Sequence, residues 1–577
     1  MLKSIKYYFL ITICLSGKLF SQNFEHDFKS RFSQQPISVS QILMNDKLGQ
    51  LLVEMNKSSL DQLIKCHKIK LVKKLDQSHS IIRLIDRDWS ILSAAKYVAV
   101  ANNDWKVSRK LSVLGIENSS NKALSVVGLS PDALMLYLNK SGITNLKLVH
   151  YYNNNVVIES DDPRIVALLK SNQSITHIDL VNNSVLEETS ISTHDLTINR
   201  INKLHSDYPA LNGETRTVSV KEDKFNSQDI DLIGREKLSG LESAFNSEHA
   251  TEMATIIGGA GNSFINGKGA AWGVNFTSSS FENILPDNDN SYADLNISVQ
   301  NHSYGTAVTD NLYGVEAKAY DENTIKHPTL LHVFSAGNIG RQVTSEGIYA
   351  GVEGYANLSG NFKMAKNVFL VGAIDENGLV DNRNSAGPAY DGRLKPELVA
   401  YGKSGTSESA ALVSGVSLLL QEHYYNQHAT LPNASLLKAA LIAGAEDVGA
   451  EGIDFRTGYG NLNAIKSMTI IENEQYYEDE VAQSSKTEYV LSLPPNVRQL
   501  KLVLTWTDVN ANVEDATALV NDLDMKLTNV ITNNSWLPWV LDHSPDADLL
   551  ALPATRNQDH LNNVEFITLD FPEAGDY

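Results

Sequence analysis

Residues 405–415 read Gly-Thr-Ser-Glu-Ser-Ala-Ala-Leu-Val-Ser-Gly. In this stretch Ser407 follows a tight Gly-Thr turn, and the small residues after it predict a helix that passes through a crowded core. A serine in the first turn of a helix lies in the positive potential of the helix N-terminus, which suits a nucleophile. The stretch is not a G-x-S-x-G elbow, because Ser409 stands where the second glycine belongs. The preceding Gly402-Lys403-Ser404 is not a phosphate-binding loop either, since Glu397 occupies the place of the first required glycine.

A nucleophilic serine needs a base, and His249 is the candidate. It lies in residues 248–259, Glu-His-Ala-Thr-Glu-Met-Ala-Thr-Ile-Ile-Gly-Gly. This segment predicts a second helix with a face of small residues, which could approach the helix that follows Ser407.

The base in turn needs an acid that orients it, and two carboxylates are available. Residues 217–224 read Thr-Val-Ser-Val-Lys-Glu-Asp-Lys. In a strand Glu222 shares a face with Val218 and Val220, whereas Asp223 points the other way unless the strand ends before it. We therefore expect Glu222 to be the acid and keep Asp223 as the alternative.

Asn338 is the candidate donor to a developing oxyanion. Residues 335–340 read Ser-Ala-Gly-Asn-Ile-Gly and follow the apolar run Leu-Leu-His-Val-Phe. A side-chain amide at the end of a buried strand can direct its N–H toward negative charge that forms in a reaction.

The pattern between residues 216 and 468 predicts the fold class. Continuous apolar runs alternate there with helical stretches, which is typical of a parallel sheet covered by helices on both faces. We therefore expect an α/β domain. The apolar runs are 217–220, 269–278, 297–303, 330–338, 368–374 and 396–402, and the clearest helices are expected at 408–424 and 434–445.

The regions on either side of this domain have different patterns. Residues 45–103 and 124–183 form an internal repeat in which each copy predicts strand, helix, strand, helix, strand, the size of a small α+β unit. Ser58 or Ser59 in the first copy and Ser130 in the second stand where helix N-caps belong. From residue 470 onward, apolar and polar residues alternate with period two, which predicts an antiparallel β-sandwich. The sequence stops where a strand is expected to open, at Tyr577, so we expect the protein to continue beyond it.

Composition and charge exclude several classes of protein. Of 577 residues, 48 are Lys or Arg and 68 are Asp or Glu, so the formal net charge is −20. This balance argues against a partner that is nucleic acid or an anionic membrane, because both require basic patches. The chain has only two cysteines, Cys14 and Cys66, which excludes a disulfide-stapled scaffold and a four-cysteine zinc site.

The N-terminus predicts export. Lys3 and Lys6 precede the apolar residues 7–15, and small residues follow up to Ser21. This is the layout of a signal peptide, and the apolar run is too short to span a bilayer as a helix. We therefore expect residues 1–21 to be removed and the protein to be secreted or held at the surface of a Gram-negative bacterial cell.

Several ordered motifs together resemble the subtilisin-like serine peptidases over about residues 196–468. The resemblance rests on the order acid, His249, Asn338, Ser407 and on four further segments. These are 269–272 (Gly-Ala-Ala-Trp), 301–305 (Asn-His-Ser-Tyr-Gly), 385–397 (Ser-Ala-Gly-Pro-Ala-Tyr-Asp-Gly-Arg-Leu-Lys-Pro-Glu) and 458–460 (Gly-Tyr-Gly). The resemblance implies a three-layer peptidase domain over 186–468 and a β-sandwich over 470–577, which we expect to be truncated at residue 577.

The resemblance also assigns roles. Ser407 would be the nucleophile, His249 the general base and acid, and Asn338 the oxyanion donor, in a serine endopeptidase that acts through an acyl-enzyme. Ser303, Tyr304 and Gly305 would bind the substrate main chain and line specificity pockets. The region 22–185, with its two repeats, would be a propeptide that inhibits its own enzyme, and the other partners would be peptide or protein substrates.

This sequence departs from the family pattern at three places. The acid is normally Asp in a D-[ST]-G turn, whereas here the register gives Glu222. The histidine motif is usually H-G-T-H, and here Glu252 replaces the second histidine. Ala411 replaces the usual proline after the nucleophile. These departures keep open a catalytically impaired protein that serves as a binding scaffold.

Two places in the sequence offer possible ligands for a metal ion. A zinc peptidase that uses His249 and Glu252 as ligands is a further alternative, although no H-E-x-x-H or H-x-x-E-H motif occurs. Asp522, Asp524 and Glu565 could bind a structural calcium ion through oxygen ligands, or could be solvated or hydrogen-bonded acids. No cofactor is expected for the reaction itself.

Overall fold

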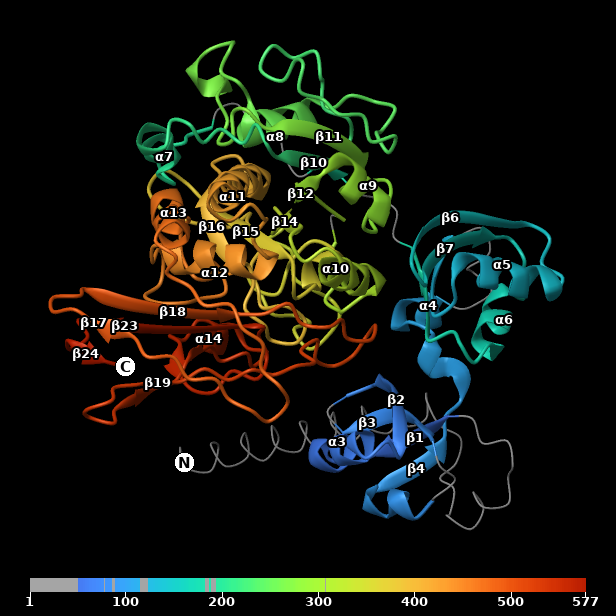
Figure 1. Cartoon of the computed structure of the whole chain (residues 1–577). Coiled ribbons are helices and arrows are strands. Elements are labelled where there is room, and N and C mark those ends of the chain that lie inside the picture. The colour runs from blue at the N-terminus through green and yellow to red at the C-terminus, as the bar shows by residue number, and fades with distance from the viewer. Residues whose placement is uncertain are drawn as a thin grey trace, which may run out of the picture. The chain divides into compact units, whose positions relative to one another are not determined.

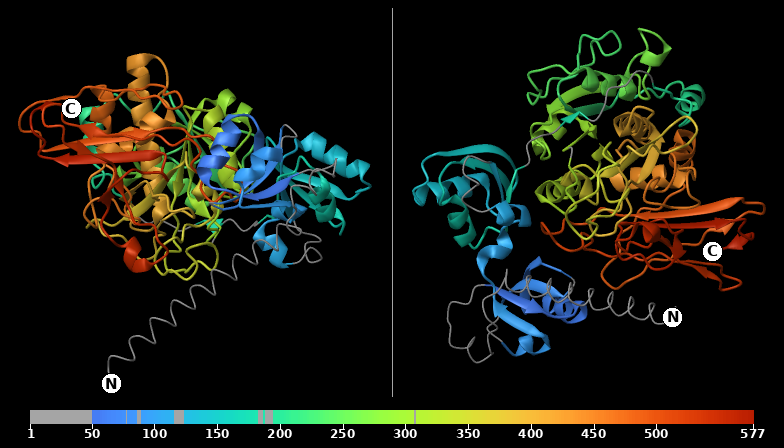
Figure 2. Two further views of the ribbon diagram at one scale, coloured as in Figure 1. Left: turned by 90° about the horizontal axis from the view of Figure 1, so that it is seen from below. Right: turned by 180° about the vertical axis from the view of Figure 1, so that it is seen from behind.

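The computed structural model describes residues 50–577 except residues 77, 86–88, 115–122, 182–185, 188–193 and 307. These residues form two compact units, shown in Figures 1 and 2. Unit 1 ends at Val181 and includes Glu514–Ala516, and unit 2 comprises Asn182–Val513 and Thr517–Tyr577. The expected signal peptide lies outside the described residues. Within the described residues, no helix combines the length and apolar character that crossing a bilayer requires.

Unit 1 contains two four-stranded antiparallel sheets with the same strand order, β2-β3-β1-β4 and β6-β7-β5-β8. In each copy the two strands in the middle of the sequence form a hairpin. The elements of the first copy are β1 (Leu51–Glu54), α3 (Lys57–Lys65), β2 (Ile69–Lys74), β3 (His79–Leu84), the 3-10 helix η1 (Trp89–Ala94) and β4 (Tyr97–Val100). After η2 (Asn103–Lys106) and α4 (Arg109–Leu114), the second copy has β5 (Ala123–Val127), α5 (Pro131–Lys140), β6 (Leu146–Tyr152), β7 (Asn155–Ser160), α6 (Ile165–Ser171) and β8 (His177–Leu180).

Two local expectations for unit 1 differ from the structure. Helix α3 begins earlier than expected, because Asn56 is its N-cap and accepts a hydrogen bond from Ser59 N at 2.8 Å. Asparagine is as effective a cap as serine, so neither Ser58 nor Ser59 is needed for this role. The second helix of the first copy is only a short 3-10 helix, since the chain from Tyr97 onward pairs with β1 as a strand. In the second copy Ser130 is the N-cap, as expected.

The fold class expected for the central region is confirmed by a six-stranded parallel sheet of order β11-β10-β12-β14-β15-β16. Its strands are β10 (Thr217–Glu222), β11 (Asn275–Ser280), β12 (Ile297–His302), β14 (Leu331–Ser335), β15 (Phe369–Ile374) and β16 (Leu398–Tyr401). The helices around it are α7 (Ile201–Asp207), α8 (Glu248–Gly258), α9 (Asp289–Leu295), α10 (Val315–Lys326), α11 (Thr406–His428), α12 (Ala434–Gly444) and α13 (Ala464–Glu472).

Alternate residues of the strands face two separate cores. Val333 and Val371 belong to the larger core, which contains apolar residues of α8, α11, α12 and α13. Phe334 and Leu370 belong to the other, which contains Ala317 and other residues of α10. Because successive side chains of a strand point to opposite faces, the sheet lies between two helical layers.

The C-terminal region consists of antiparallel pairs of strands. Its longest pair is β18 (Gln499–Thr505) with β23 (Val564–Asp570), and β18 lies beside α12, where Thr505 Oγ1 donates to Ser435 O at 2.7 Å (Figure 1). The other pairs are β17 (Ser492–Leu493) with β24 (Gly575–Asp576), β19 (Leu527–Thr528) with β20 (Ser535–Trp536), and β21 (Trp539–Val540) with β22 (Thr555–Arg556). The short helix α14 (Ala547–Leu550) lies between β21 and β22 in sequence. The limits drawn from sequence for the individual domains stay a prediction.

Buried charges connect the parallel-sheet region to the C-terminal region inside unit 2. Lys366 and Asp508 form an ion pair of 2.5 Å in which both side chains are fully buried. Asp508 also accepts hydrogen bonds from Val520 N and Asn521 N, at 2.7 and 2.9 Å. An ion pair removed from water is retained only when such bonds satisfy its remaining polar atoms.

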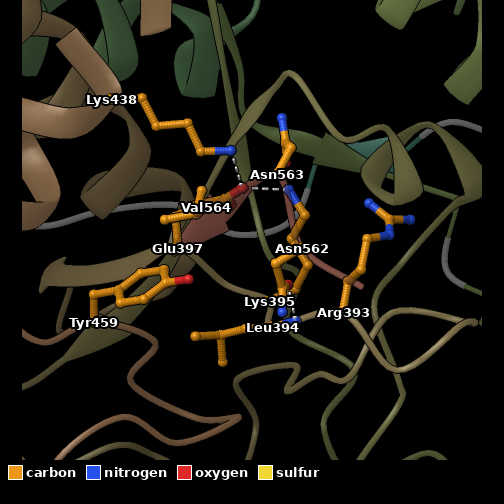
Figure 3. A pocket seen from close by; sticks show the side chains of 9 residues that line it. All are labelled: Arg393, Leu394, Lys395, Glu397, Lys438, Tyr459, Asn562, Asn563 and Val564. Carbon is orange, nitrogen blue, oxygen red and sulfur yellow. Dashed lines mark hydrogen bonds and ion pairs between the residues drawn. The ribbon is translucent and has the colours of Figure 1, made fainter. Parts of the chain in front are cut away.

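A second group of buried charges lies nearby, around Glu397. Its carboxylate lies between the ammonium groups of Lys395 and Lys438, at 2.5 and 2.9 Å (Figure 3). Burial alone would raise the pKa of Glu397, but the two lysines outweigh it and hold the pKa below its usual range. The adjoining cavity, which Asn562 and Val564 of the C-terminal region also line, has a volume of about 10 Å³. That is close to the minimum for a single water molecule, so this is a structural contact rather than a substrate site.

We predict that Asp508→Asn destabilises the whole of unit 2. The substitution leaves the ammonium of Lys366 buried without its counter-charge, and breaking such a pair costs about 3–5 kcal/mol. Chemical denaturation of the two proteins would measure this loss in the free energy of unfolding. The control is Glu488→Gln, which removes one member of the exposed Lys486–Glu488 pair and should leave the unfolding midpoint unchanged. An unchanged midpoint in Asp508→Asn would contradict the prediction.

Candidate active site

The sequence-predicted site residues come from strand ends and helix starts at one edge of the parallel sheet. Glu222 is the last residue of β10, and Asn338 follows β14. His249 lies in the first turn of α8 and Ser407 in the first turn of α11. In an open parallel sheet the carboxyl ends of the strands are where ligands bind, so this edge is the expected place for a site.

The structure joins Glu222 to His249. Glu222 Oε2 lies 2.6 Å from His249 Nδ1, and both side chains are buried, with 0% and 2% of their side-chain surface exposed. Asp223, the alternative acid, instead accepts a hydrogen bond from Ser243 Oγ at 2.7 Å. A carboxylate bonded to Nδ1 fixes the orientation of the ring and leaves Nε2 as the nitrogen available for proton transfer.

Gly405 sets the start of the helix that carries Ser407. Its φ of 153° is a conformation that residues with a side chain rarely adopt, which explains the glycine before Thr406. Farther along α11, Gly415 allows a close approach to α8, since a Cβ there would lie 2.7 Å from Ile257 O. Gly405 therefore permits the turn before α11, and Gly415 lets the helices of the serine and the histidine lie close together.

Thr406 orients Asn338. The amide oxygen of Asn338 accepts from Thr406 N at 3.1 Å and from Thr406 Oγ1 at 3.3 Å. Thr406 Oγ1 also accepts from Gly337 N at 3.0 Å. Because Oδ1 is held in this way, the amide nitrogen is the end of the side chain that can serve as a donor to an oxyanion.

A chain of hydrogen bonds fixes Ser303 against α11. Ser414 Oγ donates to Asn301 Oδ1 at 2.9 Å, and Asn301 Nδ2 donates to Ser303 Oγ at 2.9 Å. Ser303 Oγ in turn donates to Ser407 O at 3.2 Å, and Ser407 Oγ lies 3.4 Å from Ser303 O. The segment expected to bind substrate is thus directly beside the expected nucleophile.

The other two residues of that segment form a short strand. Tyr304–Gly305 is β13, and it pairs antiparallel with β9 (Leu186–Glu187). The ring of Tyr304 is buried and packs against Phe334 and Phe362, so it contributes to the core beneath the strand. Burial raises the pKa of its hydroxyl far above the usual range.

Sequence reasoning missed the supporting roles of Thr406, Asn301 and Ser414. Thr406 was visible only as part of the Gly-Thr turn, and Ser414 only as one of the small residues of α11. Their roles depend on contacts with Asn338 and Ser303, which lie far from them in sequence, and spacing along the chain carries no signal of such contacts.

The metal alternatives find little support in the side chains. Among the residues that the structure describes, no group of three or more His, Cys, Asp or Glu side chains is arranged to hold a metal ion. Asp522 bonds to His560 at 2.8 Å, and Glu565 accepts a hydrogen bond from Met525 N. Burial, followed by the charges of Asp559, Asp524 and Asp522, raises the pKa of Glu565 to about 8. Calcium binding stays a prediction.

Comparison with known proteins identifies the family. The family model described as "Subtilase family" matches residues 164–460, just over half of the chain. The chain therefore belongs to the subtilase family. The match begins before the expected start of the peptidase domain at residue 186.

Curated relatives and solved structures are similar to parts of the chain. One relative is the serine protease/ABC transporter B family protein tagA of Dictyostelium discoideum, 23% identical over 247 residues that cover 34% of this chain and 14% of that protein. Among solved structures, the epidermin leader peptide processing serine protease of Staphylococcus aureus has a TM-score of 0.46, with 16% identity and coverage of 61% and 100% of the two chains. Fervidolysin of Fervidobacterium pennivorans has a TM-score of 0.44, with 14% identity and coverage of 79% and 69%.

Glu408, the residue after Ser407, has an unusual environment for a carboxyl group. Its side chain is buried, and its Oε1 has no hydrogen-bond partner among the described residues. Burial, with a contribution from the charge of Glu252, raises the pKa of Glu408 to about 8. The carboxyl group is therefore mostly protonated at neutral pH.

This pKa predicts a pH-dependent stability. In the folded protein Glu408 keeps its proton up to about pH 8, whereas in the unfolded chain it loses it near pH 4.3. The unfolded state therefore binds fewer protons between these values, and stability falls as the pH rises from about 4.3 to 8. Glu408→Gln, which resembles the protonated acid, should remove that fall.

Thermal unfolding of the two proteins at pH 5 and pH 8 measures this effect. The midpoint of Glu408→Gln should exceed that of the wild type by more at pH 8 than at pH 5. The control is Glu376→Gln, which changes a carboxyl group on the surface and should leave the pH dependence of the unfolding midpoint unchanged. A difference between Glu408→Gln and wild type that stays constant across this range would contradict the assigned protonation.

Proposed function

We propose that the protein is a secreted serine endopeptidase made as a precursor. The observation that carries this proposal is the 2.6 Å bond between buried Glu222 and His249, at the sheet edge where Ser407 begins a helix. Membership of the subtilase family supports the same reaction. The N-terminal pattern of charged, apolar and small residues supports export.

In the proposed reaction His249 takes the proton of Ser407 as Oγ attacks the peptide carbonyl carbon. The imidazolium that forms is stabilised by Glu222. Asn338 Nδ2 and a backbone N–H donate to the oxyanion of the tetrahedral intermediate. His249 then protonates the leaving amine, which leaves an acyl-enzyme that water hydrolyses with His249 again acting as the base.

The substrate would be bound mainly through its backbone. An extended peptide can add to the free edge of a strand, where main-chain hydrogen bonds provide affinity for many sequences. The pairing of Leu186–Glu187 with Tyr304–Gly305 has this form. It supports a role for the preceding region, residues 22–185, as a propeptide that is joined directly to this pairing segment and inhibits the enzyme until it is removed.

The identity of the acid gives the sharpest kinetic test. With a chromogenic peptide substrate, Glu222→Gln should lower kcat by orders of magnitude, about 10⁴-fold by analogy with Asp→Asn in other triads. Asp223→Asn, which changes the neighbouring carboxylate, should stay within a few-fold of the wild type. Ser407→Ala defines the background rate.

The two variants separate the possible outcomes. An inactive Asp223→Asn together with an active Glu222→Gln would show that the acid is misassigned. A wild-type rate of hydrolysis no higher than that of Ser407→Ala would contradict the proposed peptidase function and favour a protein that serves as a binding scaffold. Circular dichroism of each variant would establish that it is folded.

A further inference from the structure

Lys363 is a buried lysine close to the proposed active site that takes no part in the reaction described above. It belongs to the 3-10 helix η5 (Asn361–Met364), and none of its surface is exposed. Its Nζ donates a hydrogen bond to Ser359 Oγ at 2.7 Å. Burying an ammonium group costs free energy, and an anion close to it can offset that cost. The segments around Lys363 therefore determine which anion it can bind.

One side of Lys363 borders the segment that leads to Asn338. A Cβ at Gly337 would lie 2.4 Å from Ser359 Oγ, so the hydroxyl that accepts from Lys363 lies directly against the backbone of Gly337. Ser359 N also donates to Ala336 O at 3.5 Å. The lysine is therefore one side chain away from the loop that holds the oxyanion donor.

The other side borders the substrate strand. The ring of Phe362 lies 5.3 Å from that of Tyr304, and a Cβ at Gly360 would lie 3.3 Å from Thr306 Cγ2. Burial, followed by the charges of His332, Lys221 and Lys363, lowers the pKa of His302, the residue before Ser303. Lys363 is thus near both segments that flank Ser407.

The register of β9 on β13 shows which substrate residue would meet this region. Glu187 lies opposite Tyr304, and Leu186 opposite Gly305. In a substrate bound in the same antiparallel register, the next residue would lie opposite Ser303, whose carbonyl oxygen is 3.4 Å from Ser407 Oγ. That residue would donate the acyl group and would lie next to Ser303, one residue from His302, whose pKa the charge of Lys363 helps to lower.

We propose that Lys363 selects substrates with an acidic side chain immediately before the scissile bond. This inference rests on the proposed peptidase function and adds the substrate class to it. A carboxylate is the side chain that forms a charge-assisted hydrogen bond with a buried ammonium. A neutral side chain of the same size would leave the ammonium without that bond, which makes such sites strongly selective.

The chain's own sequence contains a matching site. The residue after Glu187 is Glu188, which lies outside the described residues, and Thr189 follows it. If the enzyme removes its own propeptide in the register of β9, the bond between residues 188 and 189 is the one that the proposed specificity would cut.

Peptides that differ only in the residue before the scissile bond test the proposal. The wild type should hydrolyse the Glu peptide with a kcat/KM about 10²-fold above that of the Gln peptide. Lys363→Met should bring this ratio close to one while it still hydrolyses the Gln peptide. Lys326→Met, which removes an exposed lysine of α10, should keep the wild-type ratio.

The outcomes distinguish the two proposals. If the wild type hydrolyses none of the peptides in the series, that result would contradict the peptidase function itself. Hydrolysis of Gln or Leu peptides as fast as the Glu peptide, or a preference for Glu that survives in Lys363→Met, would overturn the role of Lys363 alone.

Self-processing gives a measurement that does not depend on the folding of the Lys363 variant. The N-terminus of the processed wild type should be Thr189, and Glu188→Gln should slow its appearance about tenfold or more. Glu187→Gln changes the neighbouring side chain and leaves the main-chain pairing in place, so processing should keep its rate. A new N-terminus that follows a non-acidic residue would overturn the proposal.

Discussion

The hydrogen bond between Glu222 and His249 is the interaction on which the rest of the site depends. It forms in the interior, where neither side chain can exchange its partner for water. Glu222 reaches this position because β10 ends there, and His249 because α8 begins beside it. The parallel sheet thus brings three segments that are distant in sequence to one edge, where Glu222 holds the ring of His249, the proposed base, in one orientation.

The same edge shows why small residues are concentrated around the serine. Gly415 lets α11 approach α8, and Ser414 begins the hydrogen bonds that fix Ser303. Thr406 holds the oxygen of Asn338, so the nitrogen end of that amide is the end that can serve as the proposed oxyanion donor. A larger residue at any of these positions would separate groups whose chemistry requires distances of about 3 Å.

The region after the parallel sheet is more closely connected to it than the sequence suggested. Lys366 and Asp508 are both fully buried, and removal of either would leave its partner in the interior without an opposite charge. Asn367 adds two hydrogen bonds to the backbone of Asp508, at 2.8 and 3.0 Å. The C-terminal strands are therefore part of the compact unit that contains the site.

Sequence reasoning predicted those features that are local. The periodicity of strands and helices was sufficient to predict the parallel sheet, and short motifs identified Ser407, His249 and Asn338 as candidate site residues. The choice between Glu222 and Asp223 depended on where one strand ends, which alternation alone leaves open. The burial of Lys363 and the hydrogen bonds of Asn301 were missed, because both depend on contacts between residues far apart in sequence. The cap at Asn56 is local, but Asn56, Ser58 and Ser59 are all suitable cap residues, so residue type alone did not distinguish them.

The central claim is that Ser407 is a nucleophile activated by the Glu222–His249 pair. Reaction with a fluorophosphonate, followed by mass spectrometry of peptides, tests it most directly. The account predicts one adduct, on Ser407, that forms rapidly in the wild type and is strongly reduced in His249→Ala. An adduct on another residue, or none on a correctly processed protein, would contradict the account.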